Sequence, residues 1–458
     1  PPTPPQPAIL KKDFVALFTT ALAEVKGGEL REPPGPRSTP LQRRDLRDNV
    51  LPRISSYAVA EKTDGRRCWL FVHPAGFAVF ADRNWRFEPH PDGAALAEKL
   101  CPRNGCTLID GELVRVRSTA HGYEKTVYLA FDAIMLDSKQ VGREEDLFSR
   151  LAALKASVDA LYEGAEDRLA SLQMPVLCKR MAPARDAVAY AAQLSPKEDD
   201  GDGLLAYRDD IRTSDCDGLV LTPTRATYLK ANGYKWKPGQ LATVDYAIYV
   251  GELEKEVRAL RQGDAYAKVG GYCSGGAGGK GGLELLLGVR VYRDQLDGVL
   301  AAARQTRAKT VVVECAFDAR GTGSWIAKGV RLDKSRPNNL GSAWRNLETV
   351  AENLELAELA ALLAAGTDDG EKGDAAIART AQHYDDRQRE RNLAKKFGGL
   401  QVAASGLGDI STMRRLQNFN KAMVMAEAYR IAEGGASVMA GEGEGESAAA
   451  PGPPPAVV

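Results

Sequence analysis

A lysine with an unusual set of neighbours is the residue in this sequence best suited to chemistry. Lys62 lies in the run Glu61-Lys62-Thr63-Asp64-Gly65-Arg66-Arg67, which has the pattern KxDGxR. Lysine is a nucleophile only when neutral, so a site that uses it must lower its pKa by desolvation or by nearby cations. Arg67 is one such cation. The alternative for so short a motif is a solvated lysine in a charged turn, and the downstream segments decide between the two.

Further polar clusters follow in order, each beside an apolar run that is typical of a strand. They are IDGELV at 109–114, AFDA at 130–133, DCDGLVL at 215–221, GYKWKP at 233–238, and a basic segment at 325–338 with the pattern RxDKxxPN. Residues two apart in a strand point to one face, so Lys235 and Lys237 should face one ligand while Trp236 faces the core. The alternative is an amphipathic edge strand with exposed lysines.

The order KTDG, DGELV, KWKP and RxDKxxPN resembles that of the mRNA guanylyltransferases, which belong with the DNA and RNA ligases to the covalent lysyl nucleotidyltransferase superfamily. The resemblance covers roughly residues 35 to 345. Ligases share KxDG and DGE but usually lack the combination of KWKP and RxDK. The resemblance implies an α+β fold, in which an antiparallel-sheet nucleotidyltransferase domain is followed by an OB-fold domain. It also implies transfer of GMP from GTP, through covalent lysyl-GMP, to the 5′-diphosphate end of RNA to form the GpppN cap.

The resemblance assigns roles at the α-phosphate of GTP. Lys62 is expected to be the attacking nucleophile. Asp217 is expected to hold a divalent ion, Mg²⁺ or Mn²⁺, and Mg²⁺ prefers few protein oxygens together with phosphate. Phosphoryl chemistry needs cations around the phosphates and an in-line geometry, and Lys235 and Lys237 fit that need.

Five more residues are expected to bind the nucleotide. Glu112 resembles the residue of the family that contacts the ribose, and Arg67 and Arg83 resemble its sugar and phosphate contacts. Phe131 is expected to stack on the purine, which every base permits because every base has a π-face. Lys179 is expected to donate to the guanine O6 acceptor. The alternative for Arg83 and Lys179 is an ordinary surface position at the end of a strand.

Arg331 and Lys334 lie in a basic segment that follows an apparent small β domain. A cationic cluster on a mobile domain makes sense if closure brings it onto the β- and γ-phosphates for the first step. Opening would then release pyrophosphate and expose the GMP to RNA. We therefore expect both residues to serve the first step.

Composition narrows the cellular setting. Lys plus Arg and Asp plus Glu both number 61 in the 458 residues, so any attraction to RNA must be local. The seven cysteines form no CxxC pair, and with four histidines they give no zinc pattern. The apolar runs are strand-length, no signal stretch opens the chain, and the lack of an initiator methionine suggests a fragment. We expect no membrane partner and a nuclear location, or a viral factory or the cytoplasm if the chain is viral.

The expected organisation has five parts. Residues 1–40 form an N-terminal extension, disordered at its proline-rich start and helical over Leu10 to Val25. Residues 41–240 form the nucleotidyltransferase domain and 241–345 the OB-fold domain, with a helix from Trp344 that ends near residue 365. Residues 366–436 are expected to be helical and faintly resemble the lead-in to cap guanine-N7 methyltransferase domains, without their glycine-rich fingerprint. Residues 437–458 are a disordered tail.

Periodicity predicts the main elements. The expected strands are 57–62, 68–73, 77–81, 108–117, 126–136, 218–221, 234–237, 244–250, 283–292 and 310–317. The expected helices are 144–161 and 186–194. Residues 270–282 are glycine-rich but lack the GxxxxGK[ST] spacing of a phosphate loop, so a flexible hairpin loop is expected.

The expected partners follow from the reaction. GTP and 5′-diphosphate RNA are the substrates, and RNA polymerase II or an equivalent transcription machinery is the expected tether. A separate RNA triphosphatase, or a region missing from this sequence, is expected to remove the RNA γ-phosphate, because the chain has neither an HCxxGxxR loop nor an alternating glutamate strand.

Two other functions remain open at this point. One is an ATP-dependent DNA or RNA ligase, which nucleotide preference in adduct formation would separate from a guanylyltransferase. The other is a catalytically inactive RNA- or polymerase-binding module. A scaffold would have no need of six intact residues: Lys62, Glu112, Asp217, Lys235, Lys237 and Arg331.

Overall fold

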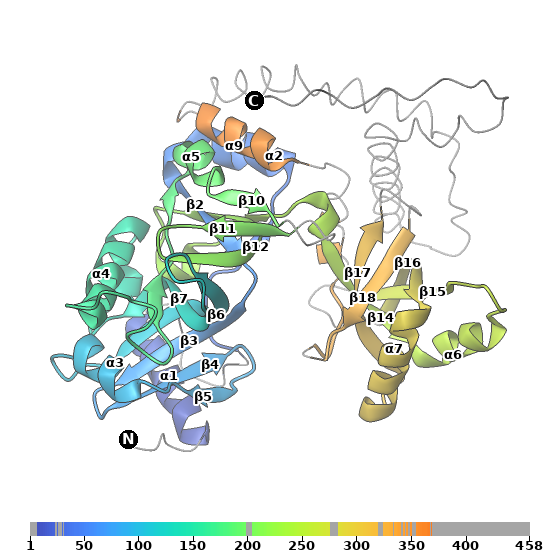
Figure 1. The fold of residues 1–458 in the computed structure, drawn as a ribbon, viewed down its shortest axis with the longest axis horizontal. Helices are drawn as coiled ribbons and strands as arrows, with labels where there is room; N and C mark the ends of the chain where they lie inside the picture. Colours follow the sequence, from blue (N-terminus) through green and yellow to red (C-terminus); the bar gives the residue numbers. More distant parts are fainter. Residues whose placement is uncertain are drawn as a thin grey trace, which may run out of the picture.

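The computed structural model describes residues 7–366 and Asp368, except 23–24, 26–29, 31, 198–203, 275–282, 319–323, 333, 340–341, 344, 347–348 and 350–353. Figure 1 shows two units, a larger α+β unit built by the first half of the chain and a smaller β barrel. The predicted segments 366–436 and 437–458 lie outside the described residues, apart from Gly366 and Asp368. No described helix has the length and hydropathy needed to cross a membrane.

The larger unit is built on one extended, mostly antiparallel sheet. Its main path runs β1 (Thr39–Pro40), β13 (Tyr234–Trp236), β12 (Arg212–Pro223), β6 (Thr107–Ser118), β3 (Arg66–His73), β4 (Phe77–Asp82) and β5 (Phe87–Pro89). The strands off this path are β2 (Tyr57–Thr63), β7 (Glu124–Met135), β8 (Val176–Cys178), β9 (Ala182–Pro183), β10 (Leu194–Pro196) and β11 (Leu205–Arg208). All seven strands predicted in this part of the chain are present. The short strands β1, β5 and β8 to β11 were not predicted, because two to four residues carry too little periodicity.

Strand β3 has a core on each face because its side chains alternate. Leu70 and Val72 pack in one core with α3 (Gly93–Leu100) and α4 (Leu147–Asp159). Trp69 and Phe71 pack in the other, where α1 (Pro7–Ala21) places Phe14 and Phe18. These phenylalanines are four residues apart, on one face of the helix, and both are 0% exposed. The predicted N-terminal helix therefore exists and contributes to the core of the larger unit.

Two predicted helices are shorter than expected. Helix α4 begins at Leu147 because the Asp146 side chain caps it by accepting from the Ser149 backbone N–H, and it ends at Asp159. Helix α5 (Ala187–Ala191) ends early because Leu194 already pairs with Tyr207 between β10 and β11.

The smaller unit is a closed five-stranded barrel, which confirms the predicted OB-type domain. Its order is β14 (Thr243–Tyr249), β15 (Tyr266–Ser274), β16 (Leu283–Tyr292), β18 (Ser324–Val330) and β17 (Thr310–Asp318), with α6 (Val250–Ala259) and α7 (Arg293–Thr306) between strands. Strands β15 and β18 were not predicted. The basic segment at 325–338 therefore does not follow the barrel as expected, because its first part is a barrel strand. Part of the expected loop at 270–282 is strand, and 275–282 lie outside the described residues.

The chain returns from the barrel to the larger unit. The predicted continuous helix at 344–365 is interrupted at Leu354 and Glu355, and α9 (Leu356–Ala365) follows. In Figure 1 the orange α9 lies on the larger unit near α5. Trp236 Nε1 donates to the Leu354 carbonyl at 2.8 Å, and Arg43 pairs with Glu358. The barrel is thus attached to the larger unit by chain on both sides.

Candidate active site

The position of Lys62 is set by a β-bulge between β2 and β12. Thr63 pairs with Cys216 and Glu61 with Leu219, so the single residue Lys62 faces the two residues Asp217 and Gly218. A bulge of this kind bends the strand and redirects side chains. It brings Lys62 Nζ to 2.7 Å from Asp217 Oδ1.

Gly218 is required by this geometry. Its φ is +151°, and a Cβ atom there would lie 1.9 Å from the Trp236 carbonyl oxygen. Glycine alone allows β12 and β13 to approach this closely. As a result Asp217 also contacts Lys237, the residue that directly follows β13. The Lys237 Nζ lies 2.5 Å from Asp217 Oδ2.

Burial and neighbouring charges shift the pKa values of both Lys62 and Asp217. Burial disfavours the Lys62 ammonium, but the attraction of Asp217, and then of Glu112 and Asp64, outweighs it and raises the pKa of Lys62. Burial likewise opposes the Asp217 carboxylate, and Lys62 and Lys237 overcome it and lower the pKa of Asp217. In the resting protein the predicted nucleophile is therefore a protonated ammonium.

Lys235 differs from the other two lysines. Burial, and then repulsion from Lys62 and Lys237, lowers its pKa from 10.5 to about 8. Lys334 of the barrel adds to this repulsion. Of these three lysines, Lys235 is the one whose charged form the surroundings disfavour. A polyanionic ligand would therefore stabilise its charged form strongly.

A cavity of about 320 Å³ opens beside Lys62. Its walls carry six of the predicted residues: Lys62, Arg67, Glu112, Phe131, Lys179 and Lys235. Aliphatic side chains such as Met181 and Val220 complete it. A small cavity with apolar walls and a few polar groups is typical of a small-molecule site.

Thr63 links two of these polar groups. Its hydroxyl donates to Glu112 and accepts from Lys179 Nζ at 2.7 Å. Lys179 Nζ also lies 3.6 Å from the Glu112 carboxylate. Lys179 is buried, so the alternative of a solvated lysine at a strand end does not apply.

Phe131 lies in a second bulge, where β7 passes β6. Asp132 pairs with Asp110 and Ala130 with Gly111, which leaves Phe131 unpaired. The cations of Arg67 and Lys179 lie 5.6 and 5.7 Å from its ring centre. The bulge thus turns an aromatic ring into the cavity between two cations.

Arg67 is fixed by a residue that sequence reasoning missed as part of the site. Asp110 is fully buried and accepts two hydrogen bonds from the Arg67 guanidinium, at 3.1 and 2.5 Å, and one from the Tyr228 hydroxyl at 2.7 Å. The signal was present, because Asp110 and Glu112 are two apart on β6 and so share a face. Thr63 was also missed.

A cleft of about 720 Å³ lies between the two units and adjoins the cavity, because Lys62 and Lys235 line both. The larger unit contributes Arg83, Asp217 and Lys237, and the barrel contributes Arg331 and Lys334. All eleven residues predicted for the site therefore line one of two adjoining hollows. Their individual roles stay predictions.

The barrel cations are held by a carboxylate of their own unit. Arg331 Nη1 lies 3.3 Å from Asp245 Oδ1, and Lys334 pairs with the other oxygen of Asp245. Asp333, the acidic residue of the RxDKxxPN pattern, lies outside the described residues.

The carboxylates of the site could bind a divalent ion only if a phosphate-containing substrate supplied further oxygen ligands. Within the described residues there is no group of three or more His, Cys, Asp and Glu side chains arranged to hold a metal. Asp217 and Asp64 both line the cleft, and burial and then Asp217 raise the pKa of Asp64. Mg²⁺ is commonly bound by one or two carboxylates plus substrate phosphates, so these residues fit it when phosphates supply the remaining oxygens.

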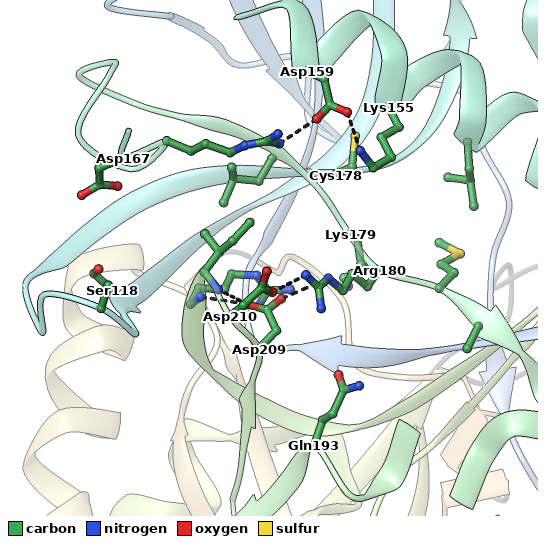
Figure 2. A pocket seen from close by; sticks show the side chains of 18 of the residues that line it. Ser118, Lys155, Asp159, Asp167, Cys178, Lys179, Arg180, Gln193, Asp209 and Asp210 are labelled. Carbon is green, nitrogen blue, oxygen red and sulfur yellow. Dashed lines mark hydrogen bonds and ion pairs between the residues drawn. The ribbon is translucent and has the colours of Figure 1, made fainter. Parts of the chain in front are cut away.

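A larger cavity of about 860 Å³ lies elsewhere, beside α4 (Figure 2). Of the predicted site residues only Lys179 lines it. Several of its charged side chains pair with each other: Arg168 with Asp159 at 2.6 Å, and Arg180 with Asp209 at 3.7 Å and with Asp210. Size alone therefore does not mark the reactive site.

The cysteines near the site are structural. Cys68 and Cys216 are fully buried, and burial raises the pKa of Cys216 to about 12. All seven cysteines are free thiols.

The protein family that matches this chain and several known proteins similar to it are described as mRNA capping enzymes. The family described as mRNA capping enzyme, catalytic domain, matches residues 10–239. The chain is 23% identical to the mRNA-capping enzyme subunit alpha of Candida glabrata, over 78% of this chain and 85% of that protein. It is 24% identical to the proteins of the same description from Kluyveromyces lactis, over 77% of this chain and 82% of that protein, and from Saccharomyces cerevisiae, over 71% and 77%.

Solved structures similar to this chain include two DNA ligases. Mycobacterial DNA ligase D complexed with ATP and MES is 17% identical, with a TM-score of 0.36, and the match covers 66% of this chain and 96% of that one. The ligase domain of M. tuberculosis LigD is 16% identical, with a TM-score of 0.30 and the same coverage.

Proposed function

Because this chain belongs to the mRNA capping enzyme family, we infer that it is an mRNA guanylyltransferase, a nucleotidyltransferase that moves GMP from GTP to the 5′-diphosphate end of RNA. One observation carries this inference at the level of the site. Lys62 lies where a small, partly apolar cavity meets a cleft lined by cations, and it is paired with Asp217 at 2.7 Å. Such a junction suits a nucleoside in the cavity and its phosphates in the cleft.

In the first half-reaction, Lys62 Nζ forms a bond to the α-phosphorus of GTP. The bond from that phosphorus to the bridging oxygen of the β-phosphate breaks, pyrophosphate leaves and Nζ loses a proton. Nucleophilic catalysis thereby divides one transfer into two easier steps. Because the pKa of Lys62 is raised by Asp217, the lysine must separate from that carboxylate before it can attack.

Mg²⁺ or Mn²⁺, when bound, would neutralise charge at the α-phosphate. Asp217 would hold it, with Asp64 as a second carboxylate at the same cleft. Lys237 remains as a cation beside the α-phosphate, and Lys235 is placed to pair with the triphosphate. These cations would hold the phosphates in line for attack.

The nucleoside would occupy the 320 Å³ cavity. Phe131 is proposed to stack on guanine, Glu112 to contact the ribose and Lys179 to donate to O6. Arg67 and Arg83 are proposed to contact sugar and phosphate. Arg331 and Lys334 would contact the β- and γ-phosphates when the barrel closes.

In the second half-reaction, a terminal oxygen of the RNA diphosphate attacks the phosphorus of lysyl-GMP. The P–N bond breaks, the GpppN cap forms and Lys62 regains its proton. The RNA γ-phosphate must be removed earlier, and we propose a separate RNA triphosphatase. The relatives are each named as a subunit alpha, which fits a partner polypeptide. We propose RNA polymerase II, or an equivalent machinery, as the tether and the nucleus as the location.

The test is label transfer from α-labelled GTP or ATP in Mg²⁺, followed by denaturation and acid treatment. Wild type, Lys62→Ala and the control Lys155→Ala, an exposed lysine at the larger cavity, should be compared. Acid-labile label from GTP alone, lost only in Lys62→Ala, is expected. Label from ATP would identify a ligase, and no label in the wild type would identify an inactive module.

A further inference from the structure

The outer surface of the barrel carries a basic and aromatic stripe that starts at the cleft. The outer stripe consists of Lys328 and Ile326 on β18, Arg290 and Tyr292 on β16, and Lys268 and Tyr266 on β15. Lys328 is exposed and lines the cleft that also holds Lys62. The stripe therefore begins where the reaction takes place.

Alternation along each strand separates the stripe from the core. Ala267, Val289, Val291, Trp325 and Ala327 are buried in the barrel core. Their neighbours in the chain must point outward, because side chains in a strand alternate between its two faces.

Strand pairing makes the stripe continuous. Arg290 pairs with Ile326 across β16 and β18, and with Lys268 across β16 and β15, and Tyr266 pairs with Tyr292. Neighbouring strands lie about 5 Å apart, so the stripe runs outward from β18 over two strand spacings, about 10 Å. A surface of this length can contact a few successive chemical groups of an extended polymer chain.

The aromatic rings and cations of the stripe lie against each other. The Arg290 guanidinium lies 4.5 Å from the Tyr266 ring centre, and the rings of Tyr266 and Tyr292 are 5.6 Å apart. Both rings are half-buried, so part of each ring surface faces solvent. Gly288 is exposed beside them, and the Lys268 side chain lies over it, since a Cβ atom at Gly288 would lie 3.0 Å from Lys268 Cε.

Arg290 and Lys268 of the stripe form no ion pair within the described residues. The outward positions of Tyr266–Lys268, Gly288–Tyr292 and Ile326–Lys328 carry no carboxylate. Arg290 Nε is buried and has no hydrogen-bond partner, and within the described chain neither Arg290 nor Lys268 pairs with Asp or Glu. The chain as a whole has zero net charge, so this is a local basic surface.

We propose that the outer stripe binds the single-stranded 5′ segment of the acceptor RNA while its diphosphate end lies in the cleft. Cations track the phosphates, and the two tyrosine rings receive bases, a combination typical of sites for single-stranded nucleic acid. An acidic protein segment would use the cations but would leave the rings unused. The proposal rests on the proposed function for the identity of its ligand, RNA.

The experiment separates the two half-reactions, because only the second needs RNA. Lysyl-GMP is formed first on wild type, on the double variant Lys268→Ala/Arg290→Ala and on Tyr266→Leu. Each is then chased with two acceptors, a 5′-diphosphate dinucleotide and a 5′-diphosphate RNA longer than the ~16 nucleotides that an OB fold can cover. The control is Lys255→Ala/Arg258→Ala on α6, which removes the same charges from exposed positions outside the stripe.

The stripe variants should form lysyl-GMP normally and cap the dinucleotide at the wild-type rate, but transfer GMP to the long RNA about tenfold more slowly at low substrate. The slope of log affinity against log salt for the long RNA should fall by about 0.7 for each cation removed. Wild-type transfer to the long RNA by both stripe variants would overturn the proposal, as would an equal loss in the control. A loss in the charge variant without one in Tyr266→Leu would also overturn it, because the phosphates would then be bound without bases on the tyrosine rings.

Failure of the proposed function would look different. If wild type formed no lysyl-GMP, RNA binding could still be measured by fluorescence anisotropy without GTP. Weaker binding by the stripe variants than by the control would then support the stripe alone, and equal binding would reject it.

Discussion

Lys62 and Asp217 lie 155 residues apart in the chain and are joined by a 2.7 Å ion pair across a β-bulge. The proposed nucleophile and the proposed metal ligand are therefore each other's partner before substrate arrives. This pair keeps Lys62 protonated, so activation requires that Asp217 exchange the ammonium for another cation.

Asp217→Asn should abolish lysyl-GMP formation. Loss of the carboxylate lowers the pKa of Lys62, which by itself would favour attack, but it also removes the proposed ligand of the divalent ion. Since losing an outer-shell partner of a metal ligand already costs about 10–100-fold, we expect a loss on the order of 100-fold or more. Single-turnover labelling with GTP measures this. Asp210→Asn, which breaks an exposed ion pair with Arg180 at the larger cavity, is the control, and a rate increase in Asp217→Asn would contradict the metal role.

Lys235→Met should stabilise the protein while weakening GTP binding. The pKa of Lys235 is about 8 in the folded protein against 10.5 ordinarily, so the folded state binds fewer protons between these values and stability from this group rises with pH. Below pH 8 the lysine is charged in both states and opposes folding. Removing it should therefore stabilise by on the order of 2 kcal/mol at pH 7 and by almost nothing above pH 10.5.

Urea unfolding at the two pH values, without nucleotide, measures this effect. Lysyl-GMP formation as a function of GTP concentration measures the weaker binding. If Lys235→Met destabilised the protein at pH 7, the charge of Lys235 would not oppose folding, and the prediction would be wrong.

Arg331→Ala and Lys334→Ala should impair the first half-reaction more than the second. Both cations line the cleft and are proposed to meet the β- and γ-phosphates, which leave as pyrophosphate. Formation of lysyl-GMP from GTP should fall, while transfer to RNA from adduct that has been formed slowly and purified should change little. Equal losses in both steps would reject gating by the barrel.

Thr63→Val should raise the KM for GTP, because the Thr63 hydroxyl links Glu112 to Lys179. A hydrogen bond to a charged group contributes about 1.5–3 kcal/mol, so an increase of about tenfold or more is expected. Thr63→Ser keeps the hydroxyl and should restore most of the affinity. If Ser and Val behave alike, the methyl packing and not the hydroxyl is what matters.

Arg212→Met should strongly destabilise the larger unit. Glu61, next to Lys62, is fully buried and is paired with Arg212 at 2.6 Å and with the Tyr190 hydroxyl. Removing one partner of a buried pair costs about 3–5 kcal/mol. Arg115→Met breaks an exposed pair with Glu124 and should cost no more than about 1 kcal/mol. Denaturant unfolding of the two variants makes the comparison, and similar losses would contradict it.

The fold was predictable where a strand has a strong apolar pattern. Strand β3 buries the continuous run 68–72, with residues on both faces, and was predicted within two residues. Strand β18 was missed because the inward residues Trp325 and Ala327 are followed at once by Lys328 and Gly329. The alternation of apolar and polar residues therefore extends over too few positions to be recognised. The closed order of the barrel depends on pairings between separate strands, which local periodicity does not contain.

The sequence by itself determined the chemical groups of the site and their family, because a lysine in KTDG, the acidic DGE and DCDG motifs and the KWKP lysines are local patterns. Only the tertiary structure decided which groups meet: Lys62 with Asp217, Arg67 with Asp110, and Thr63 with both Glu112 and Lys179. The physical reason is that β-bulges and the pairing of distant strands set these contacts. A register shift of one residue, which leaves the local pattern unchanged, would turn each side chain to the opposite face.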